Sequence, residues 1–239
     1  MGLLDIAGNI ERRILVNYRI DPEVLSKILP SPFRPRVING YAVGGICLIR
    51  FNKMRPRFFP EFMGSTSENG THRFCIEWDD NGNVRKGVFV MQRFTNSKLH
   101  ELGSNLLYPG ALSFAEFKTM EESDKYSVEF RSKSRDHVKV EVRRGNKFQS
   151  DIYSSIEEAS YDFETDSIGF SPRDNNVFDG VELVTKSWKV HPLDLVSIDS
   201  SLFENEELFP KGSVQVDHCL FMENVDHSWS KVDSVCCEG

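Results

Sequence analysis

Residues 72–91, HRFCIEWDDNGNVRKGVFVM, carry the clearest structural signal in the chain. Residues 72–78 and 84–91 are rich in β-branched and aromatic side chains, and each run is long enough for a strand. Between them lies a polar segment that contains Gly82, a residue able to take the positive φ of a tight turn. The segment therefore predicts a β-hairpin and, with it, an antiparallel sheet.

The rest of the chain continues this strand-rich pattern. Short helices are predicted from Asp21, which can cap a first turn containing Pro22, and at residues 99–107 and 154–163. Because strands follow one another with only short helices between them, the pattern favours an α+β fold, mainly antiparallel β, or a barrel. We expect one domain over residues 1–239. The further predicted strands are residues 12–19, 41–51, 112–118, 126–132, 138–143, 181–190, 195–203 and 214–222.

Composition narrows the class of protein. The 239 residues are 39% hydrophobic and 27% charged, which excludes a membrane protein, and 18 Phe with 6 Tyr argue against disorder. The net charge is -7, but residues 1–100 carry 15 basic and 9 acidic side chains, a net of +6, so the remainder carries -13. The total disfavours a nucleic-acid binder, although it leaves room for a basic surface in the first half.

Cysteine and glycine positions argue against disulfides, metals and cofactors. The five cysteines are an odd number at irregular spacings, which predicts reduced thiols and a cytoplasmic location. His72 and Cys75 would point to opposite faces of one strand, an awkward arrangement for a shared metal. Gly44 and Gly45 lie within a strand pattern and indicate a bulge or close packing. We expect no metal and no cofactor.

Two side chains carry candidate chemistry. Glu68 lies in a polar stretch, predicted as a loop, where a carboxylate near a histidine suits acid–base catalysis, although bonding to backbone amides is the commoner role of such a residue. Lys98 follows a predicted strand, and a desolvated lysine there can form a Schiff base with a carbonyl substrate. Most lysines are simply exposed to solvent, so local sequence leaves both roles open.

Residues 50–59 combine four basic with three aromatic side chains. Arginine and aromatic groups together stack nucleobases, cover an apolar edge with their stems, or hold a carboxylate in a bidentate fashion. A solvated loop over an apolar rim and a site for a small anion both fit this pattern. A nucleic-acid site fits the total charge poorly.

Several segments together resemble a known family. Residues 18–25, 28–30, 32–35, 67–70 and 217–220 are similar to segments of acetoacetate-decarboxylase-like proteins. More narrowly, the chain resembles an uncharacterised branch of that superfamily, the YqjF-like conserved proteins. The order and spacing of the matching segments carry this resemblance from about Arg12 to Trp229; they are RPR (55–57), SEN (67–69), HR (72–73), TNS (95–97), YPG (108–110), GFSP (169–172) and HPL (191–193).

The resemblance implies a cone-shaped β-barrel, largely antiparallel, with a few short peripheral helices and an internal cavity. It places Glu68 on a substrate-positioning glutamate of the family and the substrate-binding arginine at Arg12 or Arg13, where a shift of one residue decides which. It also brings Arg50 and Arg93 near the cavity. An acidic small molecule is the ligand that this arrangement implies.

The lysine pair of the decarboxylase is not reproduced. The resemblance places His100 and Glu101 at those positions, and Lys98 lies two residues away, a displacement of about 6–7 Å along a strand. A second glutamate of the family falls at Gly44 and Gly45 and is missing. These departures argue against acetoacetate decarboxylation itself, because catalytic geometry does not tolerate such a displacement.

Two functions follow from the resemblance. One is a lyase- or hydratase-type enzyme acting on a small carboxylic or keto acid, and the other is a non-catalytic protein that keeps the cavity and binds such a molecule. A homo-oligomer is compatible with both. The candidate catalytic residues are Glu68, Lys98 and His100, and the candidate substrate-binding residues are Arg12, Arg13, Arg50 and Arg93.

Overall fold

The computed structural model describes residues 5–107, 111–173 and 177–236, so the Tyr108-Pro109-Gly110 motif lies outside it. The helices are α1 (Pro22–Ile28), α2 (Lys98–Leu107) and α3 (Ile156–Thr165), with a 3-10 turn η1 (Glu61–Met63). The strands are β1 (Ile6–Ile20), β2 (Arg34–Pro35), β3 (Val37–Ile38), β4 (Tyr41–Pro56), β5 (Ser65–Asp80), β6 (Asn83–Thr95), β7 (Ser113–Glu122), β8 (Lys125–Ser132), β9 (His137–Arg144), β10 (Ile168–Pro172), β11 (Val177–Thr185), β12 (His191–Ser200) and β13 (Val214–Cys236).

The hairpin predicted at residues 72–91 is confirmed and is longer than expected. β5 and β6 pair from Asn69 opposite Thr95 down to Asp80 opposite Asn83. The turn between them places Asn81 and Gly82 at φ values of 49° and 81°, as a two-residue hairpin turn requires. The predicted turn chemistry therefore sets the register of the pair.

The polar segment that contains Glu68 is strand, and its prediction as a loop is wrong. It forms the first part of β5, where Glu68 lies opposite Arg50 of β4 and Asn69 lies opposite Thr95 of β6. Pairing on both sides overrides the low intrinsic strand preference of Ser, Glu, Asn and Gly. The site residue Glu68 is thus held by a sheet.

Two strand ends and one whole strand also differ from those predicted. β11 ends at Thr185 and β12 ends at Ser200, earlier than expected, and β10 was not predicted. Leu202 and Phe203 lie in a turn and are buried in the core, so their apolar character reflects packing. β10 is short and contains both glycine and proline, which weaken its strand signal.

The helices begin where capping residues permit. The side chain of Asp21 accepts a hydrogen bond from the backbone N–H of Glu23 at 2.8 Å and caps α1, as predicted. Ser155 caps α3 in the same way through the N–H of Glu158 at 3.2 Å. No helix in the described ranges is long and apolar enough to cross a membrane.

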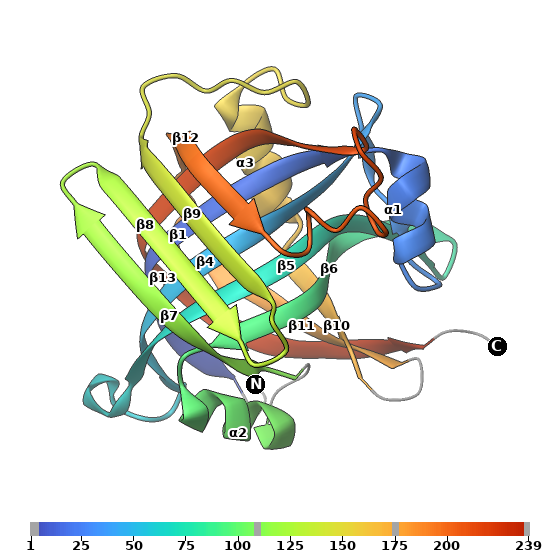
Figure 1. Cartoon of the computed structure of the whole chain (residues 1–239). Helices are drawn as coiled ribbons and strands as arrows, with labels where there is room; N and C mark the ends of the chain where they lie inside the picture. Colours follow the sequence, from blue (N-terminus) through green and yellow to red (C-terminus); the bar gives the residue numbers. More distant parts are fainter. Residues whose placement is uncertain (1–4, 108–110, 174–176, 237–239) are drawn as a thin grey trace.

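The strands pair in two closed rings that share one wall. The wall runs β13–β1–β4–β5–β6. From β6, a small ring passes through β10 and β11 back to β13, and a large ring passes through β7, β8, β9 and β12 back to β13. In Figure 1, β7, β8, β9 and β12 lie in front of the wall and α3 lies behind it. Mainly antiparallel pairing is confirmed, since only the contacts of β6 with β10 and β7 are parallel in the described sheet.

Alternate residues of the wall face the two rings. Phe74 belongs to an aromatic core on the large-ring side, whereas Cys75 belongs to a second cluster that α3 covers with Ala159 and Phe163. This alternation follows from the two-residue period of a strand. Close packing at Gly44 is confirmed, because a Cβ there would come within 2.8 Å of the Phe74 ring.

Candidate functional site

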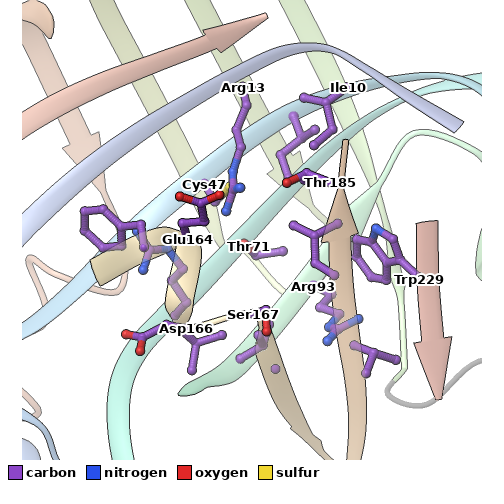
Figure 2. Close-up of a pocket in the computed structure, with 18 of the residues that line it drawn as sticks. Ile10, Arg13, Cys47, Thr71, Arg93, Glu164, Asp166, Ser167, Thr185 and Trp229 are labelled. Atoms are coloured by element: carbon purple, nitrogen blue, oxygen red, sulfur yellow. The ribbon is translucent and has the colours of Figure 1, made fainter. Parts of the chain in front are cut away.

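A pocket of about 110 Å³ is lined by residues from every strand of the small ring and from α3 (Figure 2). β1, β5 and β6 contribute Arg13, Arg73 and Arg93, and the indoles of Trp188 and Trp229 lie beside them. Three guanidinium groups around so small a volume are unusual in a protein interior, because buried charges require partners. The pocket is therefore the natural candidate for an anion site.

Arg13 is the arginine with the most evident unused capacity. Its Nε donates to Cys47 Sγ at 3.2 Å and its guanidinium lies 5.5 Å from the centre of the Trp188 ring. Its Nη1 is buried and has no hydrogen-bond partner among the described residues. Burial, together with the positive charge of Arg13, lowers the pKa of His227 to about 4.

Arg73 and Arg93 are held against aromatic rings. The Arg73 guanidinium lies 4.7 Å from the centre of Phe163 and its Nη2 donates to Asn17 Oδ1 at 2.7 Å. The Arg93 guanidinium lies 5.8 Å from the centre of Trp229. Aromatic faces fix guanidinium planes without using their hydrogen-bond donors.

Two acidic residues also line the pocket. Asp166 is engaged by Arg36, whose Nη1 lies 2.8 and 2.7 Å from its two carboxylate oxygens. Burial raises the pKa of Asp166 to about 6, and the charge of Arg36 opposes that rise. Glu164 is exposed on α3. Because Arg36 compensates Asp166, the pocket keeps a surplus of positive charge.

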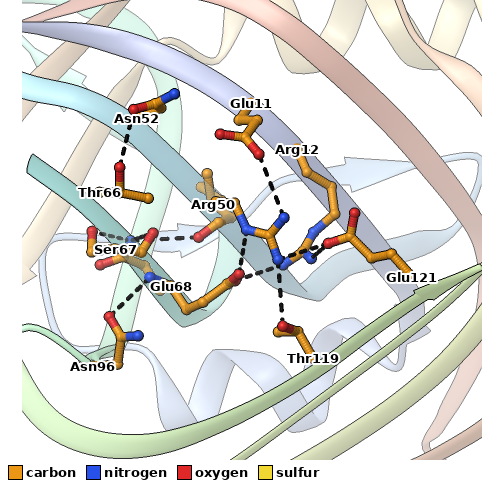
Figure 3. A network of polar contacts seen from close by, with 12 residues as sticks. Glu11, Arg12, Arg50, Asn52, Thr66, Ser67, Glu68, Asn96, Thr119 and Glu121 are labelled. Carbon is orange, nitrogen blue, oxygen red and sulfur yellow. Dashed lines mark hydrogen bonds and ion pairs between the residues drawn. The ribbon is translucent and has the colours of Figure 1, made fainter.

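The other predicted arginines lie in a separate network (Figure 3). Arg12 Nη2 lies 2.6 Å from one oxygen of Glu68, and Arg50 Nε lies 2.5 Å from the other. Glu121 of β7 completes the network by pairing with both arginines. Arg12 and Glu68 are buried, and neither lines the pocket. The open choice between Arg12 and Arg13 is thus a choice between two faces of β1.

Lys98 and His100 lie apart from both clusters. Lys98 is exposed, lines a different hollow, and holds its Nζ 5.6 Å from the centre of Phe114. His100 Nε2 is 2.7 Å from Ser65 Oγ, and burial lowers the pKa of His100. Arg12, Arg50 and Glu68 therefore lie together in the network, and Arg13 and Arg93 lie together at the pocket. Lys98 belongs to neither group.

Sequence reasoning missed Arg73 and Asp166. Arg73 lies in the predicted hairpin next to Phe74, and a charged side chain within an apolar strand is the signal that could have pointed to it. Asp166 gave no such signal, because its buried partner Arg36 is far away in the sequence. His72 and Cys75 do face opposite clusters, and no metal-binding group of three or more His, Cys, Asp or Glu occurs within the described ranges.

The fold is that of acetoacetate-decarboxylase-like proteins. Acetoacetate decarboxylase from Legionella pneumophila superposes with a TM-score of 0.65 at 15% identity, over 96% of this chain and 87% of that chain. An acetoacetate decarboxylase-like enzyme from Sphingomonas wittichii RW1 gives 0.63 at 11%, over 100% and 95%. The enduracididine biosynthesis enzyme MppR, complexed with pyruvate, gives 0.58 at 12%, over 97% and 89%.

Within this class, the sequence defines a narrower group. The model of the DUF2071 family, described as uncharacterized conserved protein (COG2071), matches residues 9–226. The chain therefore belongs to this family, and the YqjF-like assignment made from its motifs is confirmed. No curated protein matches the chain.

Proposed function

We propose that this protein binds a small carboxylic or keto acid in the pocket of the small ring, without a Schiff-base lysine. The observation that carries the proposal is the buried, unpartnered Nη1 of Arg13 beside Arg73 and Arg93. A carboxylate would supply acceptors for such donors in bidentate geometry. The closed path of strand pairings around the pocket supports the cone-like barrel and internal cavity that the resemblance implies.

The size of the pocket limits the ligand. On the same scale of cavity volume, one water molecule needs roughly 10–15 Å³. The pocket volume of about 110 Å³ therefore suits a compound of a few heavy atoms. The indoles of Trp188 and Trp229 offer apolar faces to the rest of such a molecule. MppR, a protein of the same fold, has a solved structure in complex with pyruvate, a compound of this size.

The absence of a lysine separates this pocket from Schiff-base chemistry. No lysine occurs among its described lining residues, and Lys98 lies in another hollow. An iminium requires a lysine amine at the carbonyl carbon of the substrate. We therefore place Arg13 and Arg93 in the ligand site and leave Arg12, Arg50, Glu68, Lys98 and His100 outside it.

A lyase- or hydratase-type activity is the second candidate, and Asp166 is the observation that favours it. Its pKa of about 6 lets this carboxyl group exchange a proton near neutral pH inside the pocket. Consumption of a bound keto or hydroxy acid would identify the protein as an enzyme. Binding without consumption would identify it as a binding protein.

Calorimetric titration tests the proposal. Pyruvate and acetoacetate should bind, and acetone, which lacks the carboxylate, should not. Arg13→Gln and Arg93→Gln should weaken binding at least 10-fold, which corresponds to about 1.4 kcal/mol. Arg34→Gln is the matched control, because Arg34 pairs with Asp79 on the surface. Failure of all carboxylates to bind at millimolar concentration, or equal binding of acetone, would overturn it.

Borohydride trapping tests the absence of a Schiff base. Reduction in the presence of acetoacetate or pyruvate should leave every lysine unmodified by mass spectrometry. A reduced adduct on Lys98 would show that the chain uses an iminium mechanism after all. Acetoacetate decarboxylase, treated in parallel, is the positive control.

A further inference from the structure

A chain of buried polar side chains leads from Arg73 away from the pocket. Arg73 Nη2 donates to Asn17 Oδ1 at 2.7 Å, and Asn17 Nδ2 lies 3.0 Å from His218 Nε2. His218 Nδ1 then lies 2.6 Å from Asp217 Oδ2. Asn17 is fully buried, and Arg73 and His218 are each 4% exposed. Polar groups this deeply buried are costly unless each has a partner, so their alignment calls for an explanation.

The hydrogen bonds that link Asp217 to Arg73 run in one fixed direction. Asp217 also receives hydrogen bonds from Ser150 Oγ and the N–H of Asp151, so it is a carboxylate that only accepts. His218 must therefore carry its proton on Nδ1, which leaves Nε2 as an acceptor for the Asn17 amide. That bond turns Asn17 Oδ1 toward Arg73. Burial lowers the pKa of His218, which keeps the ring neutral.

The surroundings pack closely against these groups. The rings of Phe148, Tyr153 and Phe163 pack around His218 at 5.3, 5.5 and 6.0 Å between centres. Gly45 lies opposite Asn17 on β4, and a Cβ at Gly45 would come 3.1 Å from Asn17 Oδ1. The paired glycine thus leaves the space in which the amide lies.

We propose that Asn17, His218 and Asp217 are positioning residues that orient Arg73 for the ligand carboxylate. This inference rests on the proposed function of the pocket. Asn17 occupies Nη2 of Arg73, while its Nε has no hydrogen-bond partner among the described residues. One side of the guanidinium is thereby fixed by the protein, and Nε stays available to an anion. Arg73 joins Arg13 and Arg93 as a ligand-binding residue.

The variant Asp217→Asn tests the direction of the hydrogen bonds between Asp217 and Arg73. The Asn side chain would offer an N–H to His218 Nδ1, the ring proton would move to Nε2, and Asn17 would then turn its N–H groups toward Arg73. We expect pyruvate binding about 10-fold weaker, although Asp217 does not line the pocket. Asn17→Ala should weaken binding to a similar extent, and the double variant should add little. Cys219→Ala, next to His218 and as buried as His218, should stay within twofold.

Nitrogen NMR of the imidazole supplies a readout that a purely structural role would not move. The wild-type His218 should show the Nδ1–H tautomer and Asp217→Asn the Nε2–H tautomer, with a shifted Arg73 Nε–H signal. An Nε2–H tautomer in the wild type would overturn the inference, even if the variant does not fold. Unchanged pyruvate affinity in Asn17→Ala and Asp217→Asn would overturn it while leaving the proposed function intact. If the wild type binds no pyruvate, the proposed function fails, and an unshifted Arg73 signal would then reject the positioning role separately.

Discussion

The large ring is filled with aromatic side chains, whereas the small ring encloses a pocket lined by arginines. Both rings use the same wall of strands, so the difference does not come from the backbone. It comes from which residues of each strand point to which side. Along β5, His72 packs against phenylalanines of the large ring, and its neighbour Arg73 lines the pocket. A sheet shared in this way supplies a rigid core and a binding site from one set of strands.

The same contrast separates the two adjacent arginines of β1. Arg12 is paired with two carboxylates, Glu68 and Glu121, in the network at the large-ring side. Arg13 keeps an unpartnered donor in the small ring. A buried cation paired with carboxylates holds structure together, whereas one that lines a pocket without such a pair is ready for a ligand. The two rings should therefore respond differently to substitution, in stability on one side and in affinity on the other.

The largest expected effect is the loss of a ring from the filled side. Phe130 is fully buried, with its ring centre 4.7 Å from that of Phe94, and Phe130→Ala should cost about 4 kcal/mol of unfolding free energy. Leu183→Ala, in the wall of the pocket, should cost about 1 kcal/mol, because its side chain already borders empty space. Urea denaturation of both variants measures the difference. Equal costs would show that the two rings are packed alike.

The second prediction compares Arg12 with Arg13. Arg12→Met leaves buried Glu68 with one partner fewer and should cost about 3 kcal/mol of stability, with unchanged pyruvate affinity. Arg13→Met should cost less than about 1 kcal/mol, because its Nη1 has no partner among the described residues, but should weaken pyruvate binding at least 10-fold. Urea denaturation and calorimetry on the same samples separate the two effects. A loss of affinity in Arg12→Met would place the ligand at the network instead.

The third prediction concerns acid sensitivity. Burial lowers the pKa of His72 to about 4, from an ordinary value of 6.5. Because the unfolded chain takes up this proton first, the stabilising contribution is complete above pH 6.5 and is lost as the pH falls toward 4. At pH 5 the loss is about 2 kcal/mol, calculated from the two pKa values. The variant His72→Phe should remove this loss of stability at pH 5. It keeps a ring in contact with the neighbouring aromatic side chains, which are Phe94, Phe130 and Phe203.

The measurement is the unfolding free energy of both proteins at pH 7.5 and pH 5. The difference between the two pH values should be smaller in His72→Phe by about 2 kcal/mol. His227 has a similarly lowered pKa and stays in both proteins, so part of the acid sensitivity should persist. An unchanged pH dependence in the variant would mean that His72 can reach water in the native state.

Much of the fold could be predicted from the sequence because its signals are local. The Asn81-Gly82 turn fixed the central hairpin, and Asp21 with Pro22 fixed the start of α1. The strand around Glu68 could not be predicted in this way, because its pairing partners lie in distant segments. Glu68 pairs with Arg50 of β4, and Asn69 pairs with Thr95 of β6. Local propensity has no access to pairing between distant strands.

The candidate site was predictable only in part, for a related physical reason. Arg13 and Arg93 were selected, but so were Arg12 and Arg50, because basic character alone does not tell which face of a strand a side chain takes. A one-residue shift moves a side chain to the opposite face. To predict Arg73 as a site residue, one would have to know that Asn17 and Phe163 lie beside it. Both residues are far from Arg73 in the sequence.

The smallest expected effect compares the helix caps of the two sides. Asp21→Ala and Ser155→Ala each remove an N-cap hydrogen bond and should each cost about 1 kcal/mol of stability. α1 packs Leu25 into the core of the large ring, whereas α3 holds Phe163 against Arg73 in the pocket. Only Ser155→Ala should therefore weaken pyruvate binding, by about twofold. If calorimetry shows the same change in Asp21→Ala, the pocket senses the stability of the whole protein, and the two rings are not independent in function.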